Sequence, residues 1–169
     1  LSRTTQRVIY GVHPVWEWVR RHPEQIQALH VDAPAQRRLR ALLTDAATQN
    51  LPVHISESRA LATLADTTKH QGIVATATPF LYTPLDQLPQ QDSSLLVAVD
   101  QLQDPHNLGA IIRSATAVGA AGVLVPKDGA VGVTATVEAA AAGTTAIMPI
   151  CRVTNLNRAV QTLKEDGYW

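Results

Sequence analysis

The sequence predicts an α/β protein, in which a small α/β domain is followed by the first part of a second domain built on a parallel sheet. Short apolar, β-branched runs alternate with stretches of helical spacing along all 169 residues. One stretch with three prolines and a polar cluster, residues 79–94, interrupts this alternation. We therefore expect one domain at 1–78, a linker at 79–94, and a second domain at 95–169.

In the first domain, strands are expected near 7–11, 26–31, 51–56 and 72–78, with helices at 13–21, 34–50 and 58–66. A helix over 34–50 would place Arg37, Arg38 and Arg40 on its polar face. That face is either an ordinary solvated surface or an RNA-binding surface. Trp16 and Trp18 cannot both face the core of one helix. One of them therefore packs against the linker or another domain, or is exposed and can stack on a base.

In the second domain, strands are expected at 94–100, 122–126 and 147–153, with helices at 107–120, 134–144 and 155–167. The first of these strands is nearly all apolar, which is typical of a sheet covered on both faces. Asp104 and Asn107 are candidate caps of the helix that follows it. Gly109 and Gly119 are expected to let that helix pack closely on the sheet.

Composition narrows the functional classes. No apolar run reaches the roughly 18 residues of a membrane span, so we expect a soluble protein. The single cysteine, Cys151, excludes an internal disulfide framework and suits a reducing, cytoplasmic compartment. The six histidines lack metal-ligand spacing, so no metal is expected. Neither a G-x-S-x-G elbow nor a G-x-G-x-x-G loop is present, which argues against hydrolase and dinucleotide-binding sites.

The segment after the first strand of the second domain is the best candidate site. In open α/β sheets, ligands gather at the carboxyl ends of strands, and a helix N-terminus there offers free N–H groups to an anion. Arg113 lies within that helix, where it can bind a phosphate or pair with Asp100. The first 76 residues carry nine Lys and Arg against six Asp and Glu, a mild excess that is compatible with a polyanion.

Four motifs resemble one known family. D-P-x-N-x-G-x-x-x-R-x-A-x-x-x-G, from Asp104 to Gly119, resembles the first signature of the SpoU-type RNA ribose 2′-O-methyltransferases. VIYGVHPV (8–15) and KHQGIVA (69–75) resemble the opening and the close of their N-terminal substrate-binding domain. RVTNLNRAVQTLKEDGYW (152–169) is similar to the segment after the third strand in the subgroup that acts on large-subunit ribosomal RNA.

This resemblance implies an RNA-recruiting first domain, similar to a ribosomal-protein α/β sandwich, and the start of a knotted, Rossmann-like methyltransferase domain. It implies a homodimer that uses S-adenosylmethionine to methylate a ribose, in particular of a guanosine in ribosomal RNA, with transfer RNA as the alternative. Arg113 and Asn107 fall on the family's functional arginine and asparagine. The residues implied to bind RNA are His13, Arg37, Arg38, Lys69, His70 and Gln71.

The sequence also departs from the family. Two later signatures that hold the cofactor, G-x-E-x-x-G and S-L-N-x-S, do not occur. Ala139 and Ala146 align with positions that in the family often hold a lysine and a glutamate, and Glu138 is a candidate substitute. We therefore expect a fragment that begins without Met, is inactive alone, and has its cofactor site beyond Trp169. The alternative is a non-catalytic RNA-binding relative.

Overall fold

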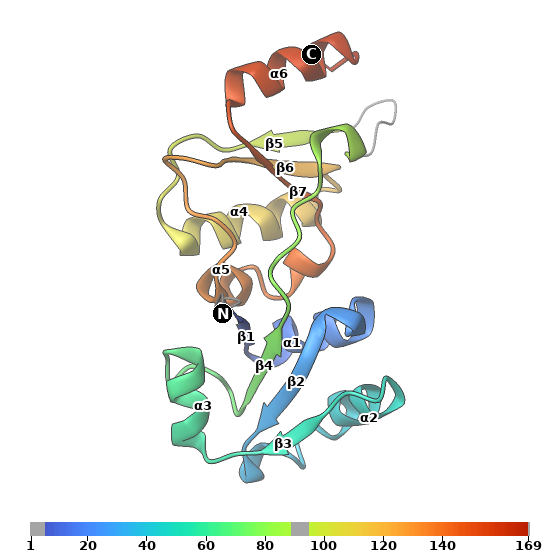
Figure 1. The fold of residues 1–169 in the computed structure, drawn as a ribbon, viewed down its shortest axis with the longest axis vertical. Coiled ribbons are helices and arrows are strands. Elements are labelled where there is room, and N and C mark those ends of the chain that lie inside the picture. The colour runs from blue at the N-terminus through green and yellow to red at the C-terminus, as the bar shows by residue number, and fades with distance from the viewer. Residues whose placement is uncertain (1–5, 89–94, 169) are drawn as a thin grey trace, which may run out of the picture.

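The computed structural model describes residues 6–88 and 95–168. It contains a four-stranded sheet of order β1-β4-β2-β3 and a three-stranded sheet of order β5-β6-β7, which are stacked along the long axis of the molecule (Figure 1). Helices cover both faces of each sheet. The α/β class predicted from the sequence is therefore confirmed, with all seven expected strands present.

The first sheet is mixed. Strand β4 (Ile73–Ala77) runs antiparallel to β1 (Arg7–Tyr10) and to β2 (Ile26–Val31), and β3 (Val53–Ile55) runs parallel to β2. Because side chains alternate along a strand, each face needs its own cover. Helices α1 (Val12–Arg21) and α2 (Arg40–Thr48) cover one face, and α3 (Ser58–Ala65) packs on the other. The 3-10 turns η1 (Pro23–Gln25) and η2 (Ala33–Ala35) flank β2.

The second sheet is parallel, as expected. It consists of β5 (Leu96–Ala98), β6 (Gly122–Pro126) and β7 (Ile150–Val153). Helices α4 (Pro105–Ala117) and α5 (Ala135–Ala140) pack on one face, and α6 (Leu156–Glu165) packs on the other together with residues near η3 (Leu85–Gln87). Cys151 is buried in this second layer, where burial raises the pKa of its thiol. It is a core residue rather than a reactive one.

Several boundaries differ from the prediction. Helix α2 begins only at Arg40, because η2 and a turn occupy the residues before it, so Arg37 and Arg38 lie outside the helix. Helix α5 ends at Ala140, after which Gly143 adopts a φ of 92° and leads into η4 (Thr144–Ala146). The expectation for Gly119 is wrong. A Cβ there would meet nothing within 4 Å, and the residue instead turns the chain with a φ of 73°.

Two further expectations are corrected in the second domain. Strand β5 is only partly covered, and Ala98 is exposed, because β5 is an edge strand of the described sheet. Asp104 caps α4 by accepting the N–H of His106 at 2.8 Å, whereas Asn107 lies inside the first turn and caps nothing. Gly109 does allow close packing, but against α5: a Cβ there would lie 2.5 Å from the Cβ of Ala140.

The two domains meet through α5, which lies between the sheets beside β1 (Figure 1). The chain that leaves β4 contributes to this contact, since Phe80 packs against the cores of both domains. Thr83 then donates its N–H to the carbonyl of Ile150 at 2.8 Å. The first residues of the segment expected as a linker are thus held against both domains, while residues 89–94 lie outside the described part of the chain.

Candidate functional site

Two of the motifs meet at one end of the first sheet. Strands β1 and β4 are antiparallel, so the residues that follow Tyr10 lie beside those that precede Ile73. There Val12 donates its N–H to Oε1 of Gln71 at 2.9 Å. Gly72 has a φ of 77°, and a Cβ on it would lie 2.5 Å from the Cβ of Ala35. Only glycine fits this position, which explains why it follows Gln71 in the motif.

Basic side chains from three segments surround this turn. Arg38 donates from Nη2 to the carbonyl of Gln71 at 2.8 Å, which joins the segment before α2 to the turn. Arg37, Lys69 and His13 are exposed. We call the six residues of this group the basic edge: His13, Arg37, Arg38, Lys69, His70 and Gln71. All six residues were predicted from the sequence, and the structure brings together the three separate segments that carry them.

His70 differs from the rest of the basic edge. It is only 4% exposed, and its Nδ1 accepts the N–H of Gly72 at 3.1 Å. In this conformation it supports the turn and does not lie at the surface as a solvated loop residue. A direct contact between His70 and RNA stays a prediction that this geometry does not favour.

The second group of predicted residues lies on α4. Its N-terminus is formed by the Asp104 cap and by Pro105 at the first helical position, a combination that stabilises a helix start. The apolar residues Leu108, Ile112 and Ala115 face the core. Asn107 and Arg113 are therefore exposed. Six residues at 3.6 per turn separate them by about 120° around the helix axis.

Arg113 is free to interact with a ligand. Among residues 6–88 and 95–168 it forms no ion pair, so the alternative of a pair with Asp100 is not what the structure shows. A guanidinium in water can bind a phosphate with two parallel hydrogen bonds, or stabilise a developing negative charge on oxygen. Whether Arg113 performs either role stays a prediction.

Beside Arg113 on the same helix lies a shallow apolar groove. It is lined by Val97 of β5 and by α4 residues Ala110, Ile111, Ser114, Ala115 and Val118. This lining provides a single hydroxyl and no carboxylate or aromatic ring. It therefore does not fit a charged nucleoside such as S-adenosylmethionine, which needs polar groups for its ribose and amino acid parts.

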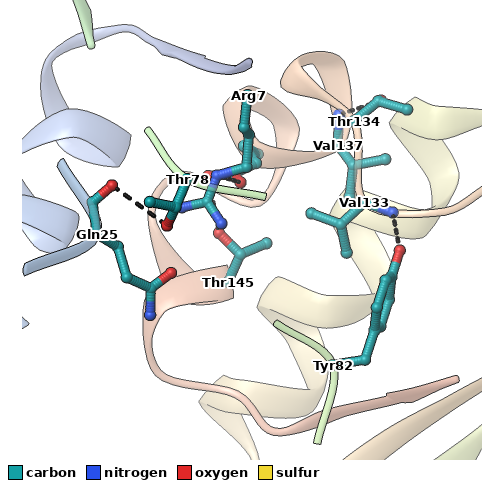
Figure 2. A network of polar contacts seen from close by, with 9 residues as sticks. Arg7, Gln25, Thr78, Tyr82, Val133, Thr134, Val137 and Thr145 are labelled. Carbon is teal, nitrogen blue, oxygen red and sulfur yellow. Dashed lines mark hydrogen bonds and ion pairs between the residues drawn. The ribbon is translucent and has the colours of Figure 1, made fainter. Parts of the chain in front are cut away.

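The most enclosed polar contact joins the two domains. Arg7 at the start of β1 reaches Glu138 of α5, with 3.3 Å between Nε and Oε1, and Figure 2 shows the guanidinium directed toward Thr145. The side chains are only 7% and 0% exposed. Burial raises the pKa of Glu138 to about 7, although Arg7, Trp18 and Thr145 act in the opposite direction. Burial also lowers the pKa of Arg7, against the effect of Glu138.

Aromatic rings surround this ion pair. The Arg7 guanidinium lies 4.1 Å from the ring centroid of Trp18 and 5.3 Å from that of Phe80. Phe80 also contacts Tyr82, whose hydroxyl accepts the N–H of Val133 at 2.9 Å (Figure 2). Trp18 is buried with its ring centroid 6.1 Å from that of Phe80, and Trp16 packs against the same core cluster, so the expectation that the two rings cannot both face the core is wrong. Trp16 is half-buried and donates to Asp45, so neither ring is fully exposed.

Arg7 was missed in the sequence, and Glu138 was noted only as a substitute for residues of the family. A lone carboxylate in an alanine-rich helix was the available signal. The structure gives that carboxylate a partner in the other domain. Ala146 likewise contacts the first domain, since its carbonyl lies 3.1 Å from Nε2 of His22.

Within residues 6–88 and 95–168, no three His, Cys, Asp or Glu side chains are grouped so that they could hold a metal ion. In the same ranges, no helix is long and apolar enough to cross a membrane.

Comparison with known proteins decides the family. Residues 8–83 match the model of the substrate-binding domain of RNA 2′-O ribose methyltransferases, and residues 94–169 match that of the SpoU rRNA methylase family. A 23S rRNA (guanosine-2′-O-)-methyltransferase RlmB from Shewanella oneidensis is 37% identical over 97% of this chain and 69% of its own length. The chain belongs to the SpoU family. The resemblance inferred from the four motifs is confirmed.

Other relatives agree with this SpoU assignment. RlmB from Nitrosomonas europaea is 38% identical over 98% of this chain, which spans 65% of that protein's length. Among solved structures, the SpoU methyltransferase AviRb from Streptomyces viridochromogenes in complex with AdoMet has a TM-score of 0.77 at 24% identity, over 98% of this chain and 60% of its own. An rRNA methyltransferase from Sinorhizobium meliloti has a TM-score of 0.76 at 21% identity, over 95% and 59%. At these identities the solved structures show a shared fold.

Proposed function

We propose that this SpoU chain carries the RNA-recognition and ribose-activating parts of a methyltransferase that modifies a guanosine 2′-hydroxyl in large-subunit ribosomal RNA. The observation that carries the proposal is the similarity along nearly the whole chain, 38% and 37% identity, to two proteins named 23S rRNA (guanosine-2′-O-)-methyltransferase. Transfer RNA is the alternative substrate. We assign RNA recruitment to residues 1–78, a connecting role to 79–94, and the catalytic part to 95–169.

The basic edge is the proposed RNA contact of the first domain. Its exposed cations, Arg37, Arg38 and Lys69, would bind phosphates, and His13 would contact the same strand of RNA. Gln71 and His70 would shape the turn that presents these groups. Phosphate contacts position an RNA without reading its sequence, so this edge supplies affinity and placement. The guanosine itself would be selected elsewhere.

Arg113 and Asn107 are the proposed catalytic residues. A ribose hydroxyl is a weak nucleophile at neutral pH. Its pKa lies far above 7, so almost none of it is present as the reactive alkoxide. A guanidinium beside the oxygen would stabilise the alkoxide that develops as the proton leaves, and a cation or donor in this role contributes about 100-fold or more to a rate. Asn107, at the exposed first turn of α4, would hold the ribose or its phosphate by hydrogen bonds from its amide.

S-adenosylmethionine is the proposed methyl donor, and it supplies the electrophilic methyl group when bound. The apolar groove beside α4 does not fit it. We propose that its site lies in the part of the relatives' length that this chain does not match, and that the chain alone is inactive. A homodimer in the cytoplasm is the proposed working form.

The RNA contact can be tested on this chain directly. Binding to a fluorescent 23S rRNA fragment would be measured at several salt concentrations. We expect the affinity to fall with added salt, and the double variant Arg38→Ala, Lys69→Ala to bind more weakly with a smaller salt slope. Arg20→Ala and Arg158→Ala, which remove exposed cations outside the basic edge, form the matched control. Equal losses in both double variants would contradict a specific role of the edge.

Catalysis needs the segment that the relatives have beyond this match. The chain would therefore be joined to the corresponding C-terminal part of the Nitrosomonas europaea relative, and transfer of labelled methyl from S-adenosylmethionine to 23S rRNA would be measured. We expect a 2′-O-methylated guanosine. A fusion that folds and binds RNA but transfers no methyl group would favour the non-catalytic, RNA-binding alternative.

A further inference from the structure

The contact between Arg7 and Glu138 is unusual because it is both enclosed and incompletely paired. Nε and Oε1 are 3.3 Å apart, but neither atom forms a hydrogen bond of good geometry. Both terminal nitrogens of Arg7 and the indole nitrogen of Trp18 are also buried without a hydrogen-bond partner in the described residues. The Thr145 hydroxyl donates a long hydrogen bond of 3.4 Å to Oε2 of the carboxylate.

Such a cluster contributes little net stability. Removing two charges from water costs several kcal/mol per ion, and well-packed apolar residues of similar volume are often as stable or more stable. The attraction between the charges, however, is strong only when the guanidinium and the carboxylate lie close together. Arg7 stacked on Trp18 has one carboxylate within reach, so the contact selects one arrangement of the two domains among several apolar alternatives.

The rest of the interface links this ion pair to both proposed functional regions. A Cβ on Gly143 would lie 3.0 Å from the carbonyl of His13, so the segment after α5 touches the start of the basic edge. On the other side of α5, Gly109 packs directly against Ala140. Gly109 is two residues from Asn107 and about one turn from Arg113. The basic edge, α5 and α4 therefore form one continuous series of backbone contacts.

We propose that Arg7 and Glu138 are positioning residues, whose enclosed ion pair fixes the substrate-binding domain on α5 in a single orientation. That orientation sets where RNA held at the basic edge meets Asn107 and Arg113. The positioning role deepens the proposed function and rests on it as far as RNA is concerned. The fixed domain orientation itself can be measured without RNA.

The test is a distance distribution between spin labels on the two domains. Labels would be attached to Ala47→Cys on α2 and Gln161→Cys on α6, both exposed, in a chain with Cys151→Ala. We expect a single narrow distribution for this parent at about pH 8, where Glu138 is ionised. Arg7→Ala and Glu138→Gln should each broaden it at least twofold. Arg20→Ala, which removes the exposed Arg20–Asp45 pair of 3.9 Å within the first domain, is the matched control and should leave it narrow.

A double variant separates positioning from simple stabilisation. Arg7→Met with Glu138→Leu replaces the pair by apolar side chains of similar size, which should keep or raise the resistance to urea. If the pair only stabilises the protein, this variant should restore the narrow distribution. If the pair positions the domains, the distribution should stay broad in a stable chain. A narrow distribution in this variant or in folded Arg7→Ala would overturn the proposal.

RNA affinity of the same variants distinguishes the two proposals. The basic edge belongs to the first domain alone, so the Arg7 and Glu138 variants should bind the rRNA fragment within about twofold of the parent. Failure of every chain to bind RNA would defeat the proposed function but leave the measured domain orientation valid. Normal RNA binding with unchanged distances would defeat the positioning role alone.

Discussion

Two arginines of this chain, Arg7 and Arg113, occupy opposite environments. Arg7 is enclosed between two domains, with Glu138 at 3.3 Å and the Trp18 ring centroid at 4.1 Å. Arg113 is exposed on α4 and has no ion-pair partner in the described part of the chain. An arginine whose guanidinium is already paired inside the protein contributes to the folded structure. An arginine whose donors are free on a solvent-facing helix is available to bind a substrate.

The two arginines also differ in the free-energy cost of keeping their charge. Burial works against the charge on Arg7 and lowers its pKa, so its environment must compensate. Arg113 is exposed, so water solvates its guanidinium. Loss of each arginine should therefore be visible in a different property: unfolding for Arg7 and methyl transfer for Arg113.

Above about pH 7, where Glu138 is ionised, Arg7→Ala should destabilise the chain by about 3 kcal/mol, because it leaves the carboxylate enclosed without a counter-charge. Urea unfolding followed by circular dichroism measures this. Arg20→Ala, which breaks the exposed Arg20–Asp45 ion pair, is the control and should change the unfolding free energy by less than about 1 kcal/mol. An effect of Arg7→Ala no larger than the control would mean that the pair is solvated and the domains are not docked as described.

Stability should fall as the pH rises through the range set by Glu138. The folded chain keeps a proton on this carboxyl up to about pH 7, whereas the ordinary value is 4.5, so the folded state binds more protons between these limits. The unfolding free energy therefore decreases from about pH 5 to about pH 7, by at most about 3 kcal/mol. Glu138→Gln should remove this slope. Because all other titratable groups are common to the two chains, the difference between their slopes is the informative quantity. Parallel curves would contradict the buried carboxylate.

Gly109→Ala should destabilise the chain by about 2 kcal/mol, a typical cost of overpacking. The added Cβ would lie 2.5 Å from Ala140 Cβ and 2.7 Å from the Val137 carbonyl, and the backbone atoms cannot simply rotate away. In an exposed helix the same change would stabilise, since alanine favours helix over glycine. Ser114→Ala, on the exposed side of α4, is the matched control. Thermal unfolding of both variants decides whether α4 and α5 are in close contact.

Arg113→Ala should change the unfolding free energy by no more than about 0.5 kcal/mol, the usual range for exposed positions without partners. Urea unfolding of this chain measures it. A loss comparable with that of Arg7→Ala would show that Arg113 has a structural partner, and the contrast between the two arginines would no longer hold.

The sequence predicted the local secondary structure better than it predicted contacts between residues far apart in the chain. The strands of both sheets were recognised because apolar runs bounded by turn residues have few alternatives. The boundary of α2 was wrong, since the Asp32 side chain caps η2 by accepting the Ala35 N–H at 2.9 Å and diverts the chain before Arg37. The basic edge was anticipated through motif resemblance, but its assembly depends on antiparallel pairing of β1 with β4. The contact between Arg7 and Glu138 was not predicted from the sequence, because no periodicity relates residues in different domains.

The central claim is that Arg113 acts on substrate rather than on the fold. Methyl transfer to 23S rRNA would be compared for the fusion with the Nitrosomonas europaea segment and for the same fusion with Arg113→Ala, and urea unfolding would be measured on the same samples. The account predicts that the rate falls about 100-fold or more while the unfolding free energy stays within about 0.5 kcal/mol. Methyl transfer within about twofold of the parent would contradict it.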